Sequence, residues 1–206
     1  MRLSAWHRGK VVAVVTTLIP GAHNASNALA ALATTVRLGV SAELAVEAIA
    51  RFRGAGRRFE VRGQVHGITV IDDYAHHPSE VRATLKAAQE RFHPGRVLAL
   101  FVPHTFSRTL ALLDGYARAF EGCELALVGP IEPARERNQA HTVTAEQVAG
   151  RIEGVAEVGV VDSARSAAYR LAAAARPGDA IVCMSVGGFD DVVGKTLEVL
   201  ERSPVA

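Results

Sequence analysis

Apolar and polar residues alternate in blocks along the chain, and the blocks predict strands and helices in turn. The first blocks predict a strand at 11–18 and two helices, at 23–38 and 41–52, with Gly39 ending the first and Ser41 capping the second. The stretch Gly54-Ala55-Gly56 then interrupts the pattern without a side chain large enough to bury. We therefore predict a first domain of residues 1–54 and a second of residues 55–206.

The second domain repeats a strand–helix alternation with short connections. The predicted elements are two short strands within 61–71, a helix at 79–92, a strand at 97–102, a helix at 109–120, a strand at 125–128, a helix opened by a Thr144–Gln147 capping box, a strand at 158–161, a helix at 164–175 capped by Asp162, a strand at 180–184 and a helix at 195–201. This order predicts an α/β fold with a doubly wound, mostly parallel sheet.

Composition narrows the class of protein only a little. The chain has 206 residues, of which 49% are hydrophobic and 21% charged, and its formal net charge of +2 gives no argument for a nucleic-acid or membrane partner. Cys123 and Cys183 lie in apolar stretches without metal-ligand spacing, so we expect buried thiols in a reducing cytosol. The apolar run at 11–19 is too short to cross a bilayer and the start lacks a signal-peptide pattern, so we predict a cytoplasmic protein.

Two acids, a phenol and two imidazoles follow the strand predicted to end near residue 71. They are Asp72, Asp73, Tyr74, His76 and His77, and Pro78-Ser79-Glu80 after them is typical of a helix start. Open α/β sheets bind ligands where strands end and helices begin, which makes this a candidate site. The alternative is a polar turn in which Asp72 or Asp73 merely caps the helix.

A second polar loop, with His104 and Arg108, follows the strand at 97–102. In a parallel sheet this loop lies on the same edge as the first, so we expect the two polar sets to face one cleft. Ser107 is a plausible helix N-cap. A Ser/His/Asp hydrolase is disfavoured, because the sequence has no G-x-S-x-G turn around this serine.

Three further patterns have both a functional and an ordinary interpretation. Asn24 and Asn27 share a helix face and can bind the edge of adenine, or one can cap the helix while the other is exposed. The arginines at 51, 53, 57 and 58 suit phosphate or carboxylate capture, or form a solvated basic linker; nucleic acid is disfavoured because no aromatic residues are interleaved. The run 187–196 imitates a Walker A loop, but its spacing is one residue too long and it carries two carboxylates, so we reject that interpretation.

Together these segments resemble the Mur ligases, in particular the members that add L-alanine to UDP-N-acetylmuramate. The matching segments are Gly21-Ala22-His23-Asn24 with Asn27-Ala28-Leu29-Ala30-Ala31, Arg57-Arg58-Phe59-Glu60, Asp72-Asp73-Tyr74-Ala75-His76-His77-Pro78-Ser79-Glu80 and Pro103-His104-Thr105-Phe106-Ser107-Arg108-Thr109. The resemblance implies that residues 1–54 are the last part of a central ATPase domain. It implies that residues 55–206 are a Rossmann-like C-terminal ligase domain.

The resemblance also implies roles for individual residues. Asn24 and Asn27 would contact the adenine of ATP, Arg58 its phosphates or ribose, and Asp73 the ribose hydroxyls. The substrate-facing residues would be Tyr74, His76, His104 and Arg108, of which His76, His104 and Arg108 would be catalytic. ATP would phosphorylate a carboxylate and the alanine amine would attack the acyl phosphate, with Arg108 steadying charge on oxygen.

The sequence departs from the family pattern in ways that affect activity. It has no P-loop lysine, no Mg²⁺-binding segment and no UDP-binding domain, the usual Gly-rich run is altered at 184–189, and Thr105 stands where some members have arginine. We therefore expect the chain to contain no metal site and to be inactive without the N-terminal and central domains. The alternatives are a non-catalytic nucleotide- or partner-binding module, or one half of a split ligase. An exposed face of the partial domain could also support a homodimer.

Overall fold

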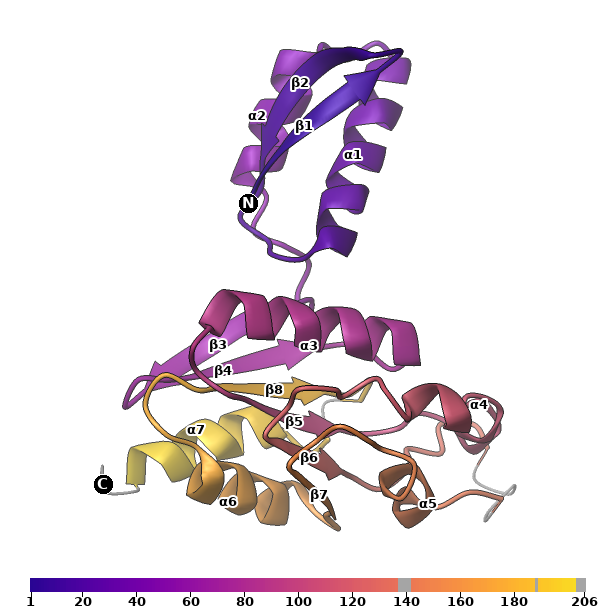
Figure 1. Ribbon diagram of the computed structural model, residues 1–206, viewed down its shortest axis with the longest axis vertical. Helices are drawn as coiled ribbons and strands as arrows, with labels where there is room; N and C mark the ends of the chain where they lie inside the picture. The colour runs from indigo at the N-terminus through magenta and orange to yellow at the C-terminus, as the bar shows by residue number, and fades with distance from the viewer. Residues whose placement is uncertain (137–141, 188, 203–206) are drawn as a thin grey trace. The chain divides into compact units, whose positions relative to one another are not determined.

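The computed structural model describes residues 1–136, 142–187 and 189–202, which form two compact units, residues 1–59 and residues 60–206 (Figure 1). Within those described ranges no helix has the length and apolar character needed to cross a bilayer. Gly188, in the run compared above with a Walker A loop, lies outside them.

The first unit is an antiparallel hairpin packed against two helices. Its elements are β1 (Arg2–His7), β2 (Lys10–Thr16), α1 (Ala22–Arg37) and α2 (Ala42–Arg51). Ala5 and Val15 of the hairpin are buried with Ala28, Leu32 and Ala45 of the helices, so small residues allow close packing. Both predicted helices and the strand in 11–18 are confirmed, and Ser41 caps α2 as expected. The strand β1 was not predicted.

The second unit contains a six-stranded sheet in the order β3-β4-β8-β5-β6-β7. Its strands are β3 (Glu60–Val65), β4 (Ile68–Asp73), β5 (Val97–Phe101), β6 (Leu125–Val128), β7 (Glu157–Val160) and β8 (Ala180–Met184). Only β3 runs antiparallel to its neighbour. Every residue of β4, β5 and β8 is buried, and β5 and β8 are apolar throughout, which is the pattern of central strands covered on both faces.

Helices cover both faces of this sheet. In Figure 1, α3 (Pro78–Phe92) lies over one face, and α6 (Ala164–Ala174) and α7 (Val192–Arg202) lie under the other. On the α6–α7 side, Leu98 and Leu100 of β5 join Ile181 and Cys183 of β8 in one buried cluster. The predicted α/β class and doubly wound, mostly parallel sheet are confirmed.

The helix predicted at 109–120 is wrong. The chain forms a short helix α4 (Phe106–Ala111), and then a 3₁₀ turn η1 (Leu113–Tyr116). Gly115 lies against Pro78, where a Cβ atom would come within 3.0 Å of the proline ring. Glycine also disfavours a continuous helix, so tertiary packing replaces the regular turn at this point.

Two other predicted helix starts need correction. Ser163, and not Asp162, caps α6, because its hydroxyl accepts a hydrogen bond from the Ser166 N–H. The last helix begins at Val192, three residues before the predicted start. The capping box that opens α5 (Ala145–Ala149) is confirmed, with Thr144 and Gln147 bonding each other's backbone N–H groups.

An ion-pair cluster joins the amino ends of β5 and β8. Arg96 donates to Asp179 at 2.6 Å, to Glu124 at 2.9 Å and to the carbonyl oxygen of Ala174 at 2.9 Å. Asp179 is only 3% exposed. Burial raises the pKa of its carboxyl, but hydrogen bonds from Arg96 and from the backbone of Arg96 and Arg176 outweigh burial and lower it overall. The cluster therefore fixes the edge of the sheet opposite the polar loops.

Candidate functional site

The register of the sheet brings the ends of β4 and β5 level with each other. Asp73 at the end of β4 and Phe101 at the end of β5 both pair with Met184 of β8. Because all three strands are parallel, the loops that follow β4 and β5 leave the same edge on either side of β8.

The loop after β4 is folded by its own side chains. The Asp73 carboxylate is buried and accepts a 2.7 Å hydrogen bond from the Ala75 N–H. Glu80 accepts hydrogen bonds from the backbone N–H groups of His76 and His77, while the His77 ring accepts from the Ser79 N–H. His77 is therefore the N-cap of α3, and the alternative in which Asp72 or Asp73 caps this helix is wrong.

The proton position on His76 follows from its contacts. Nδ1 of His76 lies 3.1 Å from the carbonyl oxygen of Tyr74 and 3.5 Å from a carboxylate oxygen of Glu80. A carbonyl oxygen only accepts, so Nδ1 carries a proton in this contact, and Nε2 is the ring nitrogen that does not take part in it.

The loop after β5 presents His104 and Arg108. Nη1 of Arg108 lies 3.5 Å from Nδ1 of His104. Thr105 has a left-handed backbone (φ 64°), which turns the chain sharply between His104 and α4. Ser107 is not the N-cap predicted for this helix: its N–H and hydroxyl both bond Glu136, a residue on a different segment.

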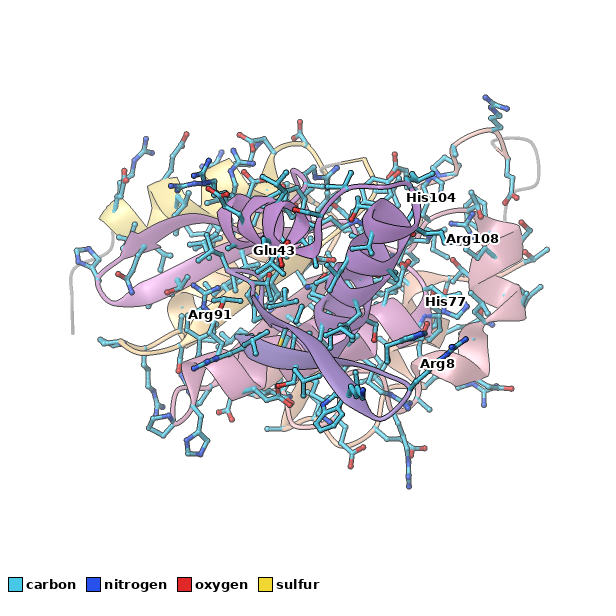
Figure 2. The ribbon with its side chains drawn as sticks, turned by 90° about the horizontal axis from the view of Figure 1, so that it is seen from above. Arg8, Glu43, His77, Arg91, His104 and Arg108 are labelled. Carbon is cyan, nitrogen blue, oxygen red and sulfur yellow. The ribbon has the colours of Figure 1, made fainter. Side chains whose placement is uncertain are left out.

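Side chains of the two loops contact each other. The ring centroids of His76 and His104 are 6.3 Å apart, and those of Tyr74 and His76 are 5.8 Å apart. Figure 2 shows His104 and Arg108 together at the end of the second unit that carries α4. The predicted meeting of the two loops at one sheet edge is confirmed.

Burial and nearby charges both change the pKa of the His104 imidazole. Burial lowers the pKa of its imidazole most strongly, Glu132 raises it, and Arg108 and His76 lower it further, so the net pKa is below the ordinary value. The ring is therefore neutral at pH 7 and can accept a proton or a hydrogen bond. A guanidinium, two imidazoles and a phenol at one sheet edge can bind a carboxylate and take a proton from a nearby amine.

The predicted nucleotide residues divide between the two units. Asn24, Asn27 and Arg58 belong to the first, and Asp73 belongs to the second. The Asn24 amide donates to the Pro20 carbonyl at 2.7 Å and lies 3.5 Å from the Asn27 amide. Neither asparagine caps α1, which begins after Gly21 without a side-chain cap, so the capping alternative is wrong.

Sequence reasoning missed Glu132 on the segment that follows β6. Its backbone N–H donates to Pro103, its carbonyl accepts from Thr105, and its carboxylate accepts from the Gly187 N–H at 3.0 Å. The signal that could have found it is its position: Glu132 also follows the carboxyl end of a parallel strand.

Both cysteines are buried, as predicted, and lie on separate strands or loops of the second unit. Burial raises the pKa of the Cys123 and Cys183 thiols to about 12. Among the residues that the structure describes, no three His, Cys, Asp or Glu side chains are arranged to hold a metal ion.

Comparison with known proteins places these loops in a family. The sequence profile described as "Mur ligase, glutamate ligase domain" matches residues 57–187. UDP-N-acetylmuramate–L-alanine ligase of Roseiflexus castenholzii is 44% identical over 172 residues, covering 84% of this chain and 36% of that protein. The enzyme of the same name from Chloroflexus aggregans is 40% identical over 190 residues, covering 92% of this chain and 40% of its own length. The chain thus spans about two fifths of these curated relatives.

Solved structures agree on the fold. The crystal structure of UDP-N-acetylmuramate-alanine ligase from Thermotoga maritima is similar with a TM-score of 0.75 at 24% identity, covering 95% of this chain and 42% of that one. A murein peptide ligase from Psychrobacter arcticus is similar with a TM-score of 0.67 at 27% identity, covering 94% and 40% of the two chains. From the profile match over more than half of its residues, the chain belongs to the Mur ligase family.

Proposed function

We propose that this chain is the C-terminal part of a cytoplasmic, ATP-dependent ligase that adds L-alanine to UDP-N-acetylmuramate. The observation that carries the proposal is the contact between the loops after β4 and β5, which groups Tyr74, His76, His104 and Arg108. The relatives named for this activity are 40–44% identical to the chain over most of its length. Residues 1–54 would complete a central domain, and residues 55–206 would form the C-terminal ligase domain.

The residues of the second unit suit the step in which alanine loses a proton and its nitrogen attacks the activated carboxylate. The Arg108 guanidinium would bind a carboxylate, of alanine or of the muramoyl group, because its N–H groups match carboxylate geometry. The imidazole of His76 or of His104 would accept the proton that the alanine ammonium must lose before its nitrogen attacks. Arg108 would then stabilise negative charge that develops on the acyl oxygen.

The chain carries groups that suit adenine and ribose. Asn27 and Asn24 present amides three residues apart on α1, and amides match the donor–acceptor edge of adenine. The carboxylate of Asp73 suits the hydroxyl donors of a ribose, and Arg58 would reach phosphate or ribose oxygens. When bound, ATP would supply the phosphoryl group that activates the carboxylate.

The chain lacks a P-loop sequence, the element that would surround the ATP phosphates. No three metal-ligating side chains converge in the described ranges. We propose that N-terminal and central domains supply the phosphate cradle, the Mg²⁺ ligands and the UDP site. We therefore expect the chain alone to bind ATP more weakly than micromolar and to form no ADP, as calorimetry and a coupled assay would measure.

A chimera tests the proposed activity directly. The matching 172-residue segment of the Roseiflexus castenholzii enzyme would be replaced by the corresponding part of this chain. We expect ADP formation that requires both UDP-N-acetylmuramate and L-alanine. A matched chimera with Arg108→Ala should lose at least about a hundredfold in kcat/KM, since a charged contact to the reacting groups is removed.

Two further results bear on the assignment. Asp73→Asn in the chimera, which keeps an oxygen acceptor for the Ala75 N–H, should raise the KM for ATP and leave the KM for alanine close to its original value. A folded chimera that binds UDP-N-acetylmuramate and ATP but forms no alanine-dependent ADP would overturn the proposed function.

A further inference from the structure

Glu132 joins the loops that follow three parallel strands. It follows β6, its backbone N–H donates to Pro103 at 2.8 Å, and its carbonyl accepts from the Thr105 N–H at 2.8 Å. These bonds form an isolated parallel bridge between Glu132 and His104. The main chain of Glu132 is therefore hydrogen-bonded to the residues on both sides of His104.

The carboxylate of Glu132 is held by the exit of β8. Its Oε2 accepts a 3.0 Å hydrogen bond from the Gly187 N–H. A Cβ atom at position 187 would come within 2.2 Å of the other carboxylate oxygen, so any side chain there would displace the Glu132 carboxylate from this position. Hydrogen bonds thus hold Glu132 through both its main chain and its side chain.

The charged and titratable groups that face His104 come from several elements. Arg108 on α4 and His76 on the loop after β4 disfavour a positive imidazole, whereas Glu132 and Glu136 favour one. Glu136 is exposed and already bonds the backbone and hydroxyl of Ser107. Glu132 exerts the stronger of the two negative influences on His104.

We propose that Glu132 is a positioning residue that fixes the His104 loop and balances the positive charge of Arg108 beside that imidazole. The proposal rests on the proposed function, which makes His104 a proton acceptor for the amino acid. When the ammonium of the amino acid transfers its proton to His104, the nitrogen becomes a neutral nucleophile and the imidazole becomes a cation. A second cation beside Arg108 is costly, and the fixed carboxylate of Glu132 offsets that cost.

The test uses the 206-residue chain and needs no ligase activity. The imidazole resonances of His104, assigned with a His104→Gln variant, would be titrated by NMR in the wild type and in Glu132→Gln, Glu132→Ala and Glu136→Gln. We expect both Glu132 variants to move the His104 midpoint to lower pH, because an attractive negative charge is lost. The Glu136→Gln control should move it less.

Amide exchange separates the charge from the hydrogen bond. Glu132→Gln retains an oxygen acceptor for Gly187, so exchange of the Gly187 N–H should stay near the wild-type rate, whereas Glu132→Ala should speed it by about tenfold. An unchanged His104 midpoint in Glu132→Gln, or a shift no larger than in Glu136→Gln, would overturn the role of Glu132.

A kinetic measurement on the chimera then tests the connection to catalysis. In the chimera, Glu132→Gln should lower kcat by a larger factor than it raises the KM for ATP. The pH profile of kcat should shift to lower pH, as the NMR midpoint of His104 does. If the midpoint moves as expected while the unaltered chimera is inactive, the proposed function fails and the electrostatic role of Glu132 stands. If the chimera is active and the midpoint does not move, the role of Glu132 fails alone.

Discussion

The hydroxyl of Tyr116 donates a 2.9 Å hydrogen bond to the backbone carbonyl oxygen of His76, across forty residues of sequence. Tyr116 is 1% exposed, and its ring lies 5.0 Å from that of Phe101 at the end of β5. One buried phenol therefore ties the loop after β4 to the strand from which the second polar loop leaves.

Tyr116→Phe should destabilise the protein and loosen the His76 loop. The substitution keeps the ring in its packing but leaves the His76 carbonyl without its donor, which costs about 1–2 kcal/mol. Urea denaturation measures the loss of stability, and exchange of the loop amides measures the loosening. Tyr169→Phe is the matched control, because Tyr169 is 52% exposed and should change stability by less than about 0.5 kcal/mol.

Removing either member of the Arg96–Asp179 pair should destabilise the second unit, and Arg96→Ala should do so more. It leaves the buried Asp179 carboxylate without its guanidinium, at a cost of about 3 kcal/mol. Asp179→Ala leaves Arg96 paired with Glu124 at the surface, which costs less. Equal losses in chemical denaturation would contradict this account.

The same pair predicts a dependence on acid. The folded-state pKa of Asp179 lies below its ordinary value of 3.8, so its contribution to stability is present above that pH and lost as the pH falls through the folded-state pKa. The stability difference between wild type and Arg96→Ala should therefore shrink below about pH 4. Denaturation curves at pH 7 and in acid measure it, and a difference that stays constant would refute the assignment.

Stability should also fall at alkaline pH. Burial raises the pKa of Tyr116, Cys123 and Cys183 to about 12, whereas the unfolded chain releases these protons near pH 9 to 10. Between these limits the folded state binds more protons than the unfolded state, so the free energy of unfolding decreases as pH rises. Each group contributes a slope of up to about 1.4 kcal/mol per pH unit. Cys183→Ala, measured in the presence of a reductant, should make the decline less steep.

Exposed apolar side chains on the hairpin should cause self-association. Trp6 is 66% exposed, Val12 is 52% exposed and Val14 is 42% exposed, which is unusual for neighbouring residues of a two-stranded sheet. We propose that a second copy can cover them, so sedimentation velocity should show association that increases with concentration. The triple variant Trp6→Gln, Val12→Thr, Val14→Thr should weaken it, whereas Leu44→Gln on α2 should not. A monomer at every concentration would exclude this contact.

Local patterns were sufficient to predict the parts of the site that depend on one strand and the helix after it. The loops at 72–80 and 103–109 follow buried strands, and their positions could be predicted from those strands. The wrong helix caps at Asp162 and Asp72 or Asp73 are local errors of one to a few residues, whereas nonlocal contacts explain the other failures. The strand β1 was missed because it contains polar residues and is extended only through its pairing with β2. Glu132 was missed because its carboxylate contacts Gly187, 55 residues away. The 3₁₀ turn after α4 likewise packs through Gly115 against Pro78, far earlier in the chain.

The position of β8 between β4 and β5 determines when the protein can first acquire its working form. On the ribosome, residues 68–73 and 97–101 emerge long before residues 180–184, yet the two earlier strands are hydrogen-bonded to the last one and not to each other. A nascent chain that stops short of Met184 therefore lacks the strand that separates His76 and His104 by the correct width. Such a chain exposes two apolar strand edges that are ready to pair wrongly, which makes late synthesis the period of greatest risk of aggregation.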